Sequence, residues 1–352
     1  MLLQLLPTNT PESTPSIQRG SFHGAGGTLL GMQIVNVCLT IVTLGAYHFW
    51  AKAKIRRYLF SQTAFAGDRF AYHGTGKELY QGFLKAMVVF GIPYFSLGAA
   101  HSFLALPQSV DFLLQAMAAL VLFLYVPVAI VNARRYRCTR TSWRGIRFSF
   151  RGRTVDFLKL YFKGWLFTLL TLGTYYPYFQ TQRQAFLHSH TYFGNQRFQF
   201  TGHGSGLMVP FAVTLFTTYA VLCLCGLALA LQLTNAGLTL LLIPFVLGPV
   251  WVWLLGQKQK YYWDHTTFGE ARFSSSITWQ KLFGLYLGNL ALLLLTLGWA
   301  WPWVTVRNAR FFIGTLSLQG LTDLDRVLQD TTETSVTGEG LSNLLDTGFE
   351  MD

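Results

Sequence analysis

The chain has 352 residues, of which 51% are hydrophobic and only 12% are charged. Soluble chains average about 25% charged residues because water must wet their surface. This composition therefore excludes an ordinary soluble or secreted domain and indicates an integral membrane protein. The net charge is +12, but the basic residues lie in short loops between apolar segments. That arrangement is typical of membrane orientation, and we expect no nucleic-acid partner.

The N-terminal residues 1–18 join a short apolar start to a stretch rich in Pro, Ser and Thr. The start is too short for the core of a signal peptide, and we predict that 1–18 is disordered. The four cysteines of the chain show neither a disulfide framework nor the C-x-x-C spacing of a zinc site. We therefore expect no metal and no other cofactor.

Seven hydrophobic segments of about 20 residues follow, each long enough to span about 30 Å of hydrocarbon. They cover residues 28–50, 82–106, 110–132, 157–179, 207–232, 237–256 and 281–304. Tight connections at 107–109 and 235–237 predict that the second and third segments, and the fifth and sixth, form helical hairpins. The predicted fold class is therefore an all-α polytopic membrane protein with seven helical segments.

A Thr-Leu-Gly tripeptide recurs in the first, fourth and seventh segments. Its residues are Thr43, Leu44 and Gly45, then Thr171, Leu172 and Gly173, then Thr296, Leu297 and Gly298. An aromatic residue and then basic residues follow each copy at matching positions. These matches predict an internal duplication, with a first unit at 19–146, a second at 147–271 and a partial third at 272–320.

The basic loops contain a shorter element, a Gly followed within a few residues by Arg-Phe. It occurs at 67–70, 145–148, 194–198 and 269–273. Around two of these elements polar and aromatic residues alternate, which is the period of a β-strand. We therefore predict short β-hairpins that lie at the membrane surface, outside the helical segments.

Several of these motifs resemble a known family. Phe22-x-Gly24, the run from Leu39 to Trp50, Arg56-Arg57 and His73-Gly74-Thr75-Gly76-x-Glu78-Leu79 look like the YjgN-like family of bacterial inner-membrane proteins. The resemblance covers about 19–320. The later copies depart from it, because Ala300 replaces the Tyr47 of the first copy and Glu78 has no acidic counterpart. It implies a bacterial inner-membrane location but no activity, because the function of the family is unknown.

Two topologies fit the segments. If all seven cross, with the N-terminus outside, the two full units become inverted repeats. If the Thr-Leu-Gly segments 28–50, 157–179 and 281–304 are re-entrant or interfacial, only the two hairpin pairs cross and every basic loop lies on one side. Cytoplasmic loops are enriched in Lys and Arg, so we favour the second topology.

The C-terminal residues 321–352 hold eight of the fifteen acidic residues of the chain. They are also poor in aromatic residues, and such a composition cannot bury enough apolar surface to order itself. We predict that this acidic tail is disordered and that it lies in the cytoplasm with the basic loops.

Basic residues just beyond the apolar segments are the first candidate sites. They are Lys54, Arg56, Arg57, Arg134, Arg135, Arg183, Arg307 and Arg310. Such residues orient helices in the membrane, and Arg also binds lipid phosphates through paired hydrogen bonds. We expect membrane lipids with anionic headgroups as partners, and the sequence leaves the oligomeric state open.

Polar residues within the apolar segments are the second set of candidates, because such groups are costly in a membrane. Asn36 and Asn289 stand at matching positions before the Thr-Leu-Gly tripeptide, and Lys163 lies next to the matching position in the second copy. Two roles fit them, hydrogen bonding between helices and the lining of a polar path.

The sequence contains no motif that carries catalysis, and we expect no enzymatic activity. Transport or permeation of a small solute or lipid is the first functional hypothesis, because many transporters are built from duplicated helical units. The alternative is a non-enzymatic protein that binds anionic lipids or scaffolds the membrane.

Overall fold

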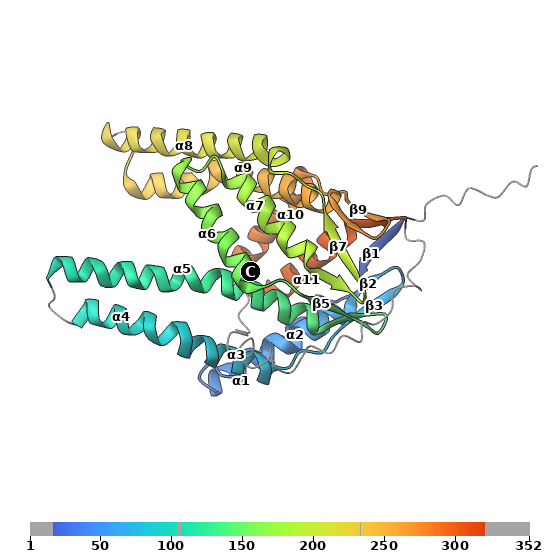
Figure 1. The fold of residues 1–352 in the computed structure, drawn as a ribbon. Helices are drawn as coiled ribbons and strands as arrows, with labels where there is room; N and C mark the ends of the chain where they lie inside the picture. The colour runs from blue at the N-terminus through green and yellow to red at the C-terminus, as the bar shows by residue number, and fades with distance from the viewer. Residues whose placement is uncertain (1–16, 104–106, 233, 321–352) are drawn as a thin grey trace, which may run out of the picture.

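The computed structural model describes residues 17–103, 107–232 and 234–320. The acidic tail 321–352, and all of the predicted N-terminal segment 1–18 except its last two residues, lie outside this description. Strands gather at one end of the molecule, and the longest helices project from the other end (Figure 1).

Pairs of helices alternate with β-hairpins along the chain, and the single strands β1 and β10 stand at the two ends of the series. The strands are β1 (Gln18–Phe22), β2 (Thr63–Phe65), β3 (Asp68–Tyr72), β4 (Thr141–Trp143), β5 (Ile146–Phe150), β6 (Thr191–Phe193), β7 (Gln196–Phe200), β8 (Thr266–Phe268), β9 (Ala271–Ser275) and β10 (Leu316–Gln319). The helices are α1 (Gly26–Val42), α2 (His48–Gln62), α3 (Gly76–Ala86), η1 (Met87–Gly91), α4 (Ile92–Phe103), α5 (Gln108–Thr139), α6 (Thr154–Leu170), α7 (Tyr176–Ser189), η2 (Gly204–Leu207), α8 (Met208–Ala230), α9 (Ala236–Asp264), α10 (Trp279–Leu295) and α11 (Trp301–Gly314).

Across the described residues, the strands close into an antiparallel barrel of ten. Each strand pairs with its neighbours in chain order, and β1 also pairs with β10, where Arg19 lies opposite Ser317. The barrel is thus sealed by its first and last strands. Closure satisfies the backbone groups that an edge strand would leave unpaired.

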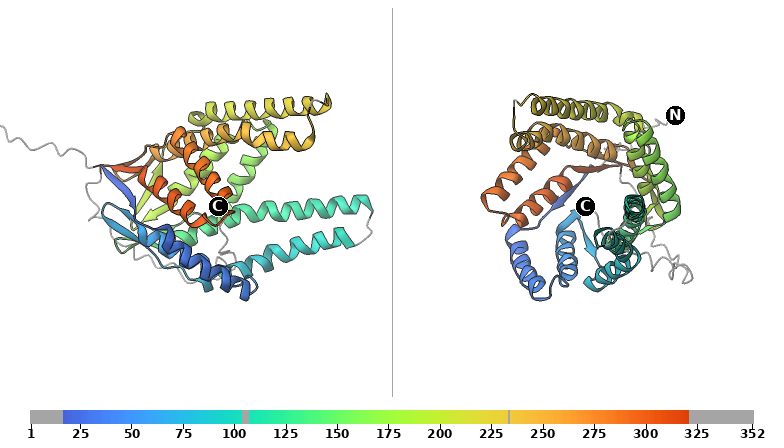
Figure 2. Two further views of the ribbon diagram at one scale, coloured as in Figure 1. Left: turned by 180° about the vertical axis from the view of Figure 1, so that it is seen from behind. Right: turned by 90° about the vertical axis from the view of Figure 1, so that its left-hand side faces the viewer.

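The strands on either side of each helical pair bond to each other, as in β1 with β2 and β3 with β4. The fold is therefore a ring of strand–helix–helix–strand modules, five of them within the described ranges. Viewed from the end where the long helices project, the helical pairs surround a central space (Figure 2, right). Neighbouring modules touch through α2 with α3, α5 with α6, α9 with α10 and α11 with α1.

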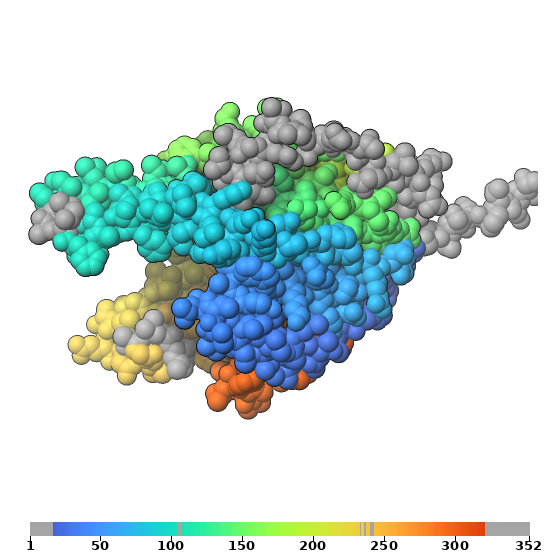
Figure 3. Space-filling model, turned by 90° about the horizontal axis from the view of Figure 1, so that it is seen from below, coloured from blue at the N-terminus to red at the C-terminus, as the bar shows by residue number. Residues whose placement is uncertain are grey.

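Alternate modules carry short and long helical pairs. The short hairpins are α1–α2, α6–α7 and α10–α11, whose first helices have 17 residues each. The long hairpins are α3–α4 with α5, and α8 with α9. In the space-filling view the two long hairpins project as separate posts beyond the rest of the molecule (Figure 3).

Local sequence explains where helices give way to strands. Four strands begin with a Thr whose hydroxyl donates to the carbonyl oxygen four residues earlier, over 2.6–2.9 Å. Such a side chain competes with the helical hydrogen bonds. The residues are Thr63, Thr141, Thr191 and Thr266. Beyond them, Arg and Phe alternate in β3, β5, β7 and β9, so that Arg faces outward and Phe faces inward.

The predicted fold class is wrong in two respects. The hairpins do form, but they join edge to edge into a closed barrel instead of lying separately at the surface. The described residues also contain four helices that are long and apolar enough to cross a membrane, not seven. These are Gly76–Phe103, Gln108–Thr139, Gly204–Ala230 and Gly237–Asp264.

The three remaining apolar segments are each broken by their Thr-Leu-Gly tripeptide. The helix ends at Val42, Leu170 or Leu295, and a second helix begins at His48, Tyr176 or Trp301. The predicted units 19–146 and 147–271 each hold one short and one long module, and 272–320 holds a single short one. Their origin by duplication stays a prediction.

Candidate functional site

The interior of the barrel holds a cavity of about 430 Å³ whose wall is mostly aromatic. The rings come in two layers from four hairpins. They are Phe65, Trp143, Phe193 and Phe268, and then Phe70, Phe148, Phe198 and Phe273. In the second layer the ring centroids of neighbouring residues lie 6.2–6.4 Å apart in stacked arrangement, within the range favoured by aromatic pairs.

The fifth position of this second layer belongs to β1, where Gly20 follows Arg19. A Cβ atom at Gly20 would lie 2.6 Å from the carbonyl oxygen of Ile313. The end of α11 therefore fills the space that a Phe ring occupies in the other modules. Near the seam between β1 and β10 the cavity wall is aliphatic and is formed by Leu316 and Leu318.

At the end of the cavity nearer the helices, the lining becomes polar and basic. We call this part the basic end. Its residues are Arg134 and Arg137 from α5, His188 and Thr191 from α7 and β6, and Thr266 from β8. Arg134 donates to the Thr191 hydroxyl over 3.4 Å, and its Nε is buried without a hydrogen-bond partner in the described part of the chain.

His188 is the titratable ring of the basic end. Burial, and then the nearby charge of Arg134, lower the pKa of His188 from 6.5 to about 4, because both disfavour the protonated ring. The neutral ring is held by the Thr266 hydroxyl at 3.3 Å and by the Gln184 amide at 2.8 Å. The positive charge of the basic end therefore comes from its arginines at neutral pH.

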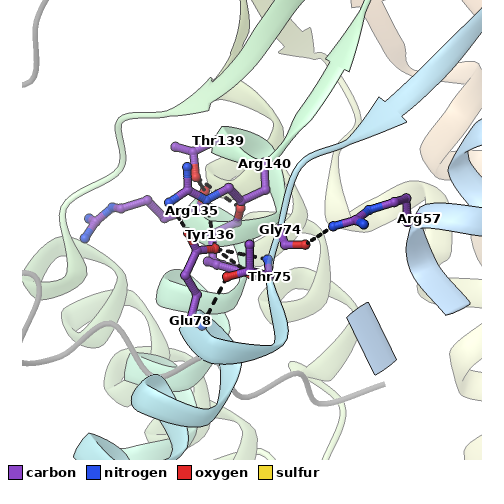
Figure 4. Close-up of polar contacts among 8 residues, drawn as sticks. All are labelled: Arg57, Gly74, Thr75, Glu78, Arg135, Tyr136, Thr139 and Arg140. Atoms are coloured by element: carbon purple, nitrogen blue, oxygen red, sulfur yellow. Dashed lines mark hydrogen bonds and ion pairs between the residues drawn. The ribbon is translucent and has the colours of Figure 1, made fainter. Parts of the chain in front are cut away.

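None of the described residues that line the cavity is acidic. The nearby carboxylate of Glu78 is already engaged elsewhere: it accepts hydrogen bonds from Arg140 at 2.8 Å and from Tyr136 at 3.1 Å (Figure 4). Glu78 also caps α3 in a reciprocal pair with Thr75. The cavity thus presents guanidinium groups to an apolar chamber, and no carboxylate belongs to the part of its wall that the structure describes.

Three of the sequence-predicted arginines join neighbouring modules instead. Arg57 donates to the Gly74 carbonyl at 3.4 Å (Figure 4), Arg135 to that of Gly152 at 3.0 Å, and Arg310 to that of Gly24 at 3.4 Å. Each bond runs from the second helix of one module to the segment that leads into the next. We call these residues the clamp arginines.

The other predicted basic residues are spread among the helices. Lys54 is exposed, and Arg56 is half-buried on α2. Arg183 on α7 has a buried Nε without a hydrogen-bond partner among the described residues. Arg307 lies against α10, within 3.1 Å of the place where a Gly288 Cβ atom would stand. The structure therefore brings Arg134 alone of the predicted set into the cavity wall.

The predicted intramembrane polar residues differ in their burial and in their hydrogen-bond partners. Asn289 is buried and donates to Asn308 Oδ1 at 2.7 Å, which links α10 to α11. Asn36 is 3% exposed, and its amide has no hydrogen-bond partner in the described part of the chain. Lys163 is exposed, with its Nζ 5.9 Å from the centre of the Phe167 ring. The three residues therefore have different surroundings, and none of them lines the barrel cavity.

Sequence reasoning missed His188, and it missed the convergence of the aromatic residues in the barrel. The signal that could have found His188 is positional. His188 stands three residues before the Thr that begins a strand. The residues at the same position before the other three such Thr residues are Phe60, Cys138 and Trp263, and they line the cavity as His188 does.

A model of the family described as "Bacterial protein of unknown function (DUF898)" matches residues 17–344. The chain belongs to this family. It is 35% identical over 130 residues to "Inner membrane protein YjgN" of Escherichia coli O157:H7, and 33% identical over 131 residues to the protein of that name in Salmonella typhimurium. Each match covers 37% of this chain and 30% of the relative. No solved structure matches the chain.

These matches confirm the resemblance to YjgN-like proteins. The names of the relatives, together with the four long apolar helices of the described ranges, support an inner-membrane location for this family member. They carry no information about activity.

Proposed function

We propose that this family member is a non-enzymatic inner-membrane protein that binds an anionic lipid at the basic end of its barrel cavity. The observation that carries the proposal is Arg134, whose Nε is buried without a hydrogen-bond partner among the described residues. Arg134 stands at an aromatic chamber that has no acidic residue in its described wall. A phosphate would place negative charge beside Arg134 and accept paired hydrogen bonds from its guanidinium group.

The position of the basic end favours a lipid over a soluble anion. Arg134 and Arg137 lie in the last two turns of α5, one of the long apolar helices, just before it enters the barrel. This junction is where an apolar helix would leave the hydrocarbon and reach the headgroups. A phospholipid phosphate in the same leaflet would stand at that level.

The distribution of basic residues supports a membrane orientation that agrees with this proposal. The long hairpins begin and end at the barrel, so the residues near 107 and 235 at their far ends both lie at the opposite end of the molecule (Figure 1). Those turns contain no Lys or Arg, whereas the barrel side is rich in both. The enrichment of basic residues in cytoplasmic loops supports a barrel in the cytoplasm, with the acidic tail starting on that side.

The transport hypothesis has less support in the geometry. A path for a polar solute needs polar groups along its length, whereas stacked Phe rings line the barrel interior. Asn36, Lys163 and Asn289 are not among the residues that line the cavity. Lipid binding accounts for both the arginines and the aromatic wall.

The test compares two double variants of equal charge. Arg134→Ala/Arg137→Ala removes the basic end, and Arg69→Ala/Arg197→Ala removes two exposed arginines from the outside of the barrel. Each protein is purified in mild detergent, and its co-purified phosphatidylglycerol and cardiolipin are measured by mass spectrometry. We expect at least a tenfold loss of anionic lipid in the first variant and little change in the second. Equal lipid in both variants, with unchanged thermal unfolding, would refute the proposal.

A further inference from the structure

We infer that the three Thr-Leu-Gly turns are insertion tips that enter the bilayer from the barrel side and end near its midplane, with hydrocarbon as their partner. The inference goes beyond lipid binding at the basic end. It concerns the short hairpins α1–α2, α6–α7 and α10–α11 and a different surface of the molecule.

The backbone of the turns is the first observation. Leu44, Leu172 and Leu297 have φ angles of 51°, 48° and 49°, in the left-handed region that strains any residue with a Cβ atom. Gly normally takes this place, and here Gly is the next residue in each turn. A strained Leu at all three turns indicates that its side chain has a use.

That use is not packing within the protein. The side chains of Leu44, Leu172 and Leu297 are 96%, 80% and 90% exposed. Their neighbours at the tips are also apolar and exposed, as in Val42, Leu170 and Leu295. Exposed apolar side chains at a turn are unfavourable in water, whereas in hydrocarbon each apolar side chain stabilises the inserted tip.

Hydrogen bonds within each turn satisfy its Thr hydroxyl and the N–H of its Gly, which favours placement in hydrocarbon. The Thr43 hydroxyl donates to the Leu39 carbonyl at 2.7 Å and accepts from the Tyr47 backbone N–H at 2.9 Å. Thr171 and Thr296 repeat both bonds at 2.7 Å and 3.0 Å. In each turn the Gly N–H donates back to a helix carbonyl at 2.8 Å. A turn that only faced water would not need the Thr.

The depth of the tips follows from helix geometry. From Arg56 back to His48, where α2 begins, the helix rises about 12 Å at 1.5 Å per residue, and the turn at Leu44 lies beyond that point. If the basic residues lie at headgroup level, the tip reaches about half of the roughly 30 Å of hydrocarbon. The long helix α5, with 32 residues, extends about 48 Å and crosses completely. The short hairpins pack beside the long ones, so their apolar surfaces are continuous.

The experiment measures depth in the full chain. The four native cysteines are replaced by Ser, and nitroxide labels are placed through Leu44→Cys, Leu172→Cys or Leu297→Cys in vesicles of phosphatidylethanolamine and phosphatidylglycerol. Where a turn variant fails to fold, Val42→Cys on the adjoining helix replaces it. We expect the tips to be at least tenfold more accessible to oxygen than to a water-soluble nickel complex, and Arg69→Cys on the barrel to show the reverse.

A second measurement separates a half-inserted tip from a crossing one. A membrane-impermeant maleimide is added to intact cells that express Leu44→Cys or Pro107→Cys, the latter at the far turn of a long hairpin. We expect labelling at 107 and none at 44. Labelling at 44 from the periplasm, or preference of the tip nitroxides for the nickel complex, would overturn the inference. Neither result would bear on the lipid co-purified with the basic end.

Discussion

Arg134 and Arg135 are consecutive residues with opposite environments. Arg134 faces the cavity and has a buried Nε without a partner among the described residues, whereas Arg135 donates to a backbone carbonyl of the next module. Successive residues of an α-helix point about 100° apart, so a pair of arginines necessarily reaches two surfaces. Under the proposed function Arg134 contributes its charge to lipid binding, whereas Arg135 joins two neighbouring modules.

The largest effect we expect from this difference is a dependence of stability on pH. The pKa of His188 is about 4 in the folded protein and about 6.5 when unfolded, so the unfolded chain binds more protons between these values. The free energy of unfolding should therefore be constant above pH 6.5 and fall by about 3 kcal/mol as the pH drops to 4. Thermal unfolding in detergent across this range measures it.

Variants of the two arginines sharpen that prediction. Arg134→Ala removes a charge that lowers the pKa of His188, so its loss of stability at low pH should be smaller than in the parent protein. Arg135→Ala should leave the pH profile unchanged. Identical pH profiles for the parent protein and both variants would show that the charge of Arg134 does not affect the pKa of His188. His188→Gln is the control: a flat pH profile in this variant would assign the effect to the His188 ring.

The next effect concerns stability at neutral pH. Arg135→Ala leaves the carbonyl of the buried Gly152 without its donor, which should lower the free energy of unfolding by about 1–3 kcal/mol. Arg134→Ala removes a partly buried charge and should not destabilise the protein without lipid. Denaturation of the two variants in delipidated detergent compares them. A larger fall in the free energy of unfolding for Arg134→Ala than for Arg135→Ala would contradict the different roles given to the two arginines.

The smallest effect is expected at Glu78, which links α3 to the end of α5. Glu78→Gln weakens the ion pair with Arg140, whose partners are each about a third exposed, but the amide still allows the helix cap with Thr75. Solvent screening limits such pairs to about 1 kcal/mol or less. We expect a small fall in melting temperature and unchanged co-purified lipid, because Glu78 lies outside the cavity wall.

The sequence contains the local elements of this fold almost completely. Apolar length marks the long hairpins, the alternation of Arg and Phe marks the strands, and the Thr-Leu-Gly copies mark equivalent places in three modules. These features depend on neighbouring residues, which act through helix and strand periods alone. The same reading also found Arg134, because basic residues beyond an apolar helix are conspicuous.

Only the tertiary structure decided how these elements combine. The barrel is closed by pairing Arg19 with Ser317, and a contact between the two ends of the chain leaves no local pattern. The cavity exists because four hairpins turn their rings toward one axis, which no single hairpin dictates. The Thr-Leu-Gly segments were long enough to cross, and the left-handed Leu that reverses each of them is a conformation no Leu is expected to adopt.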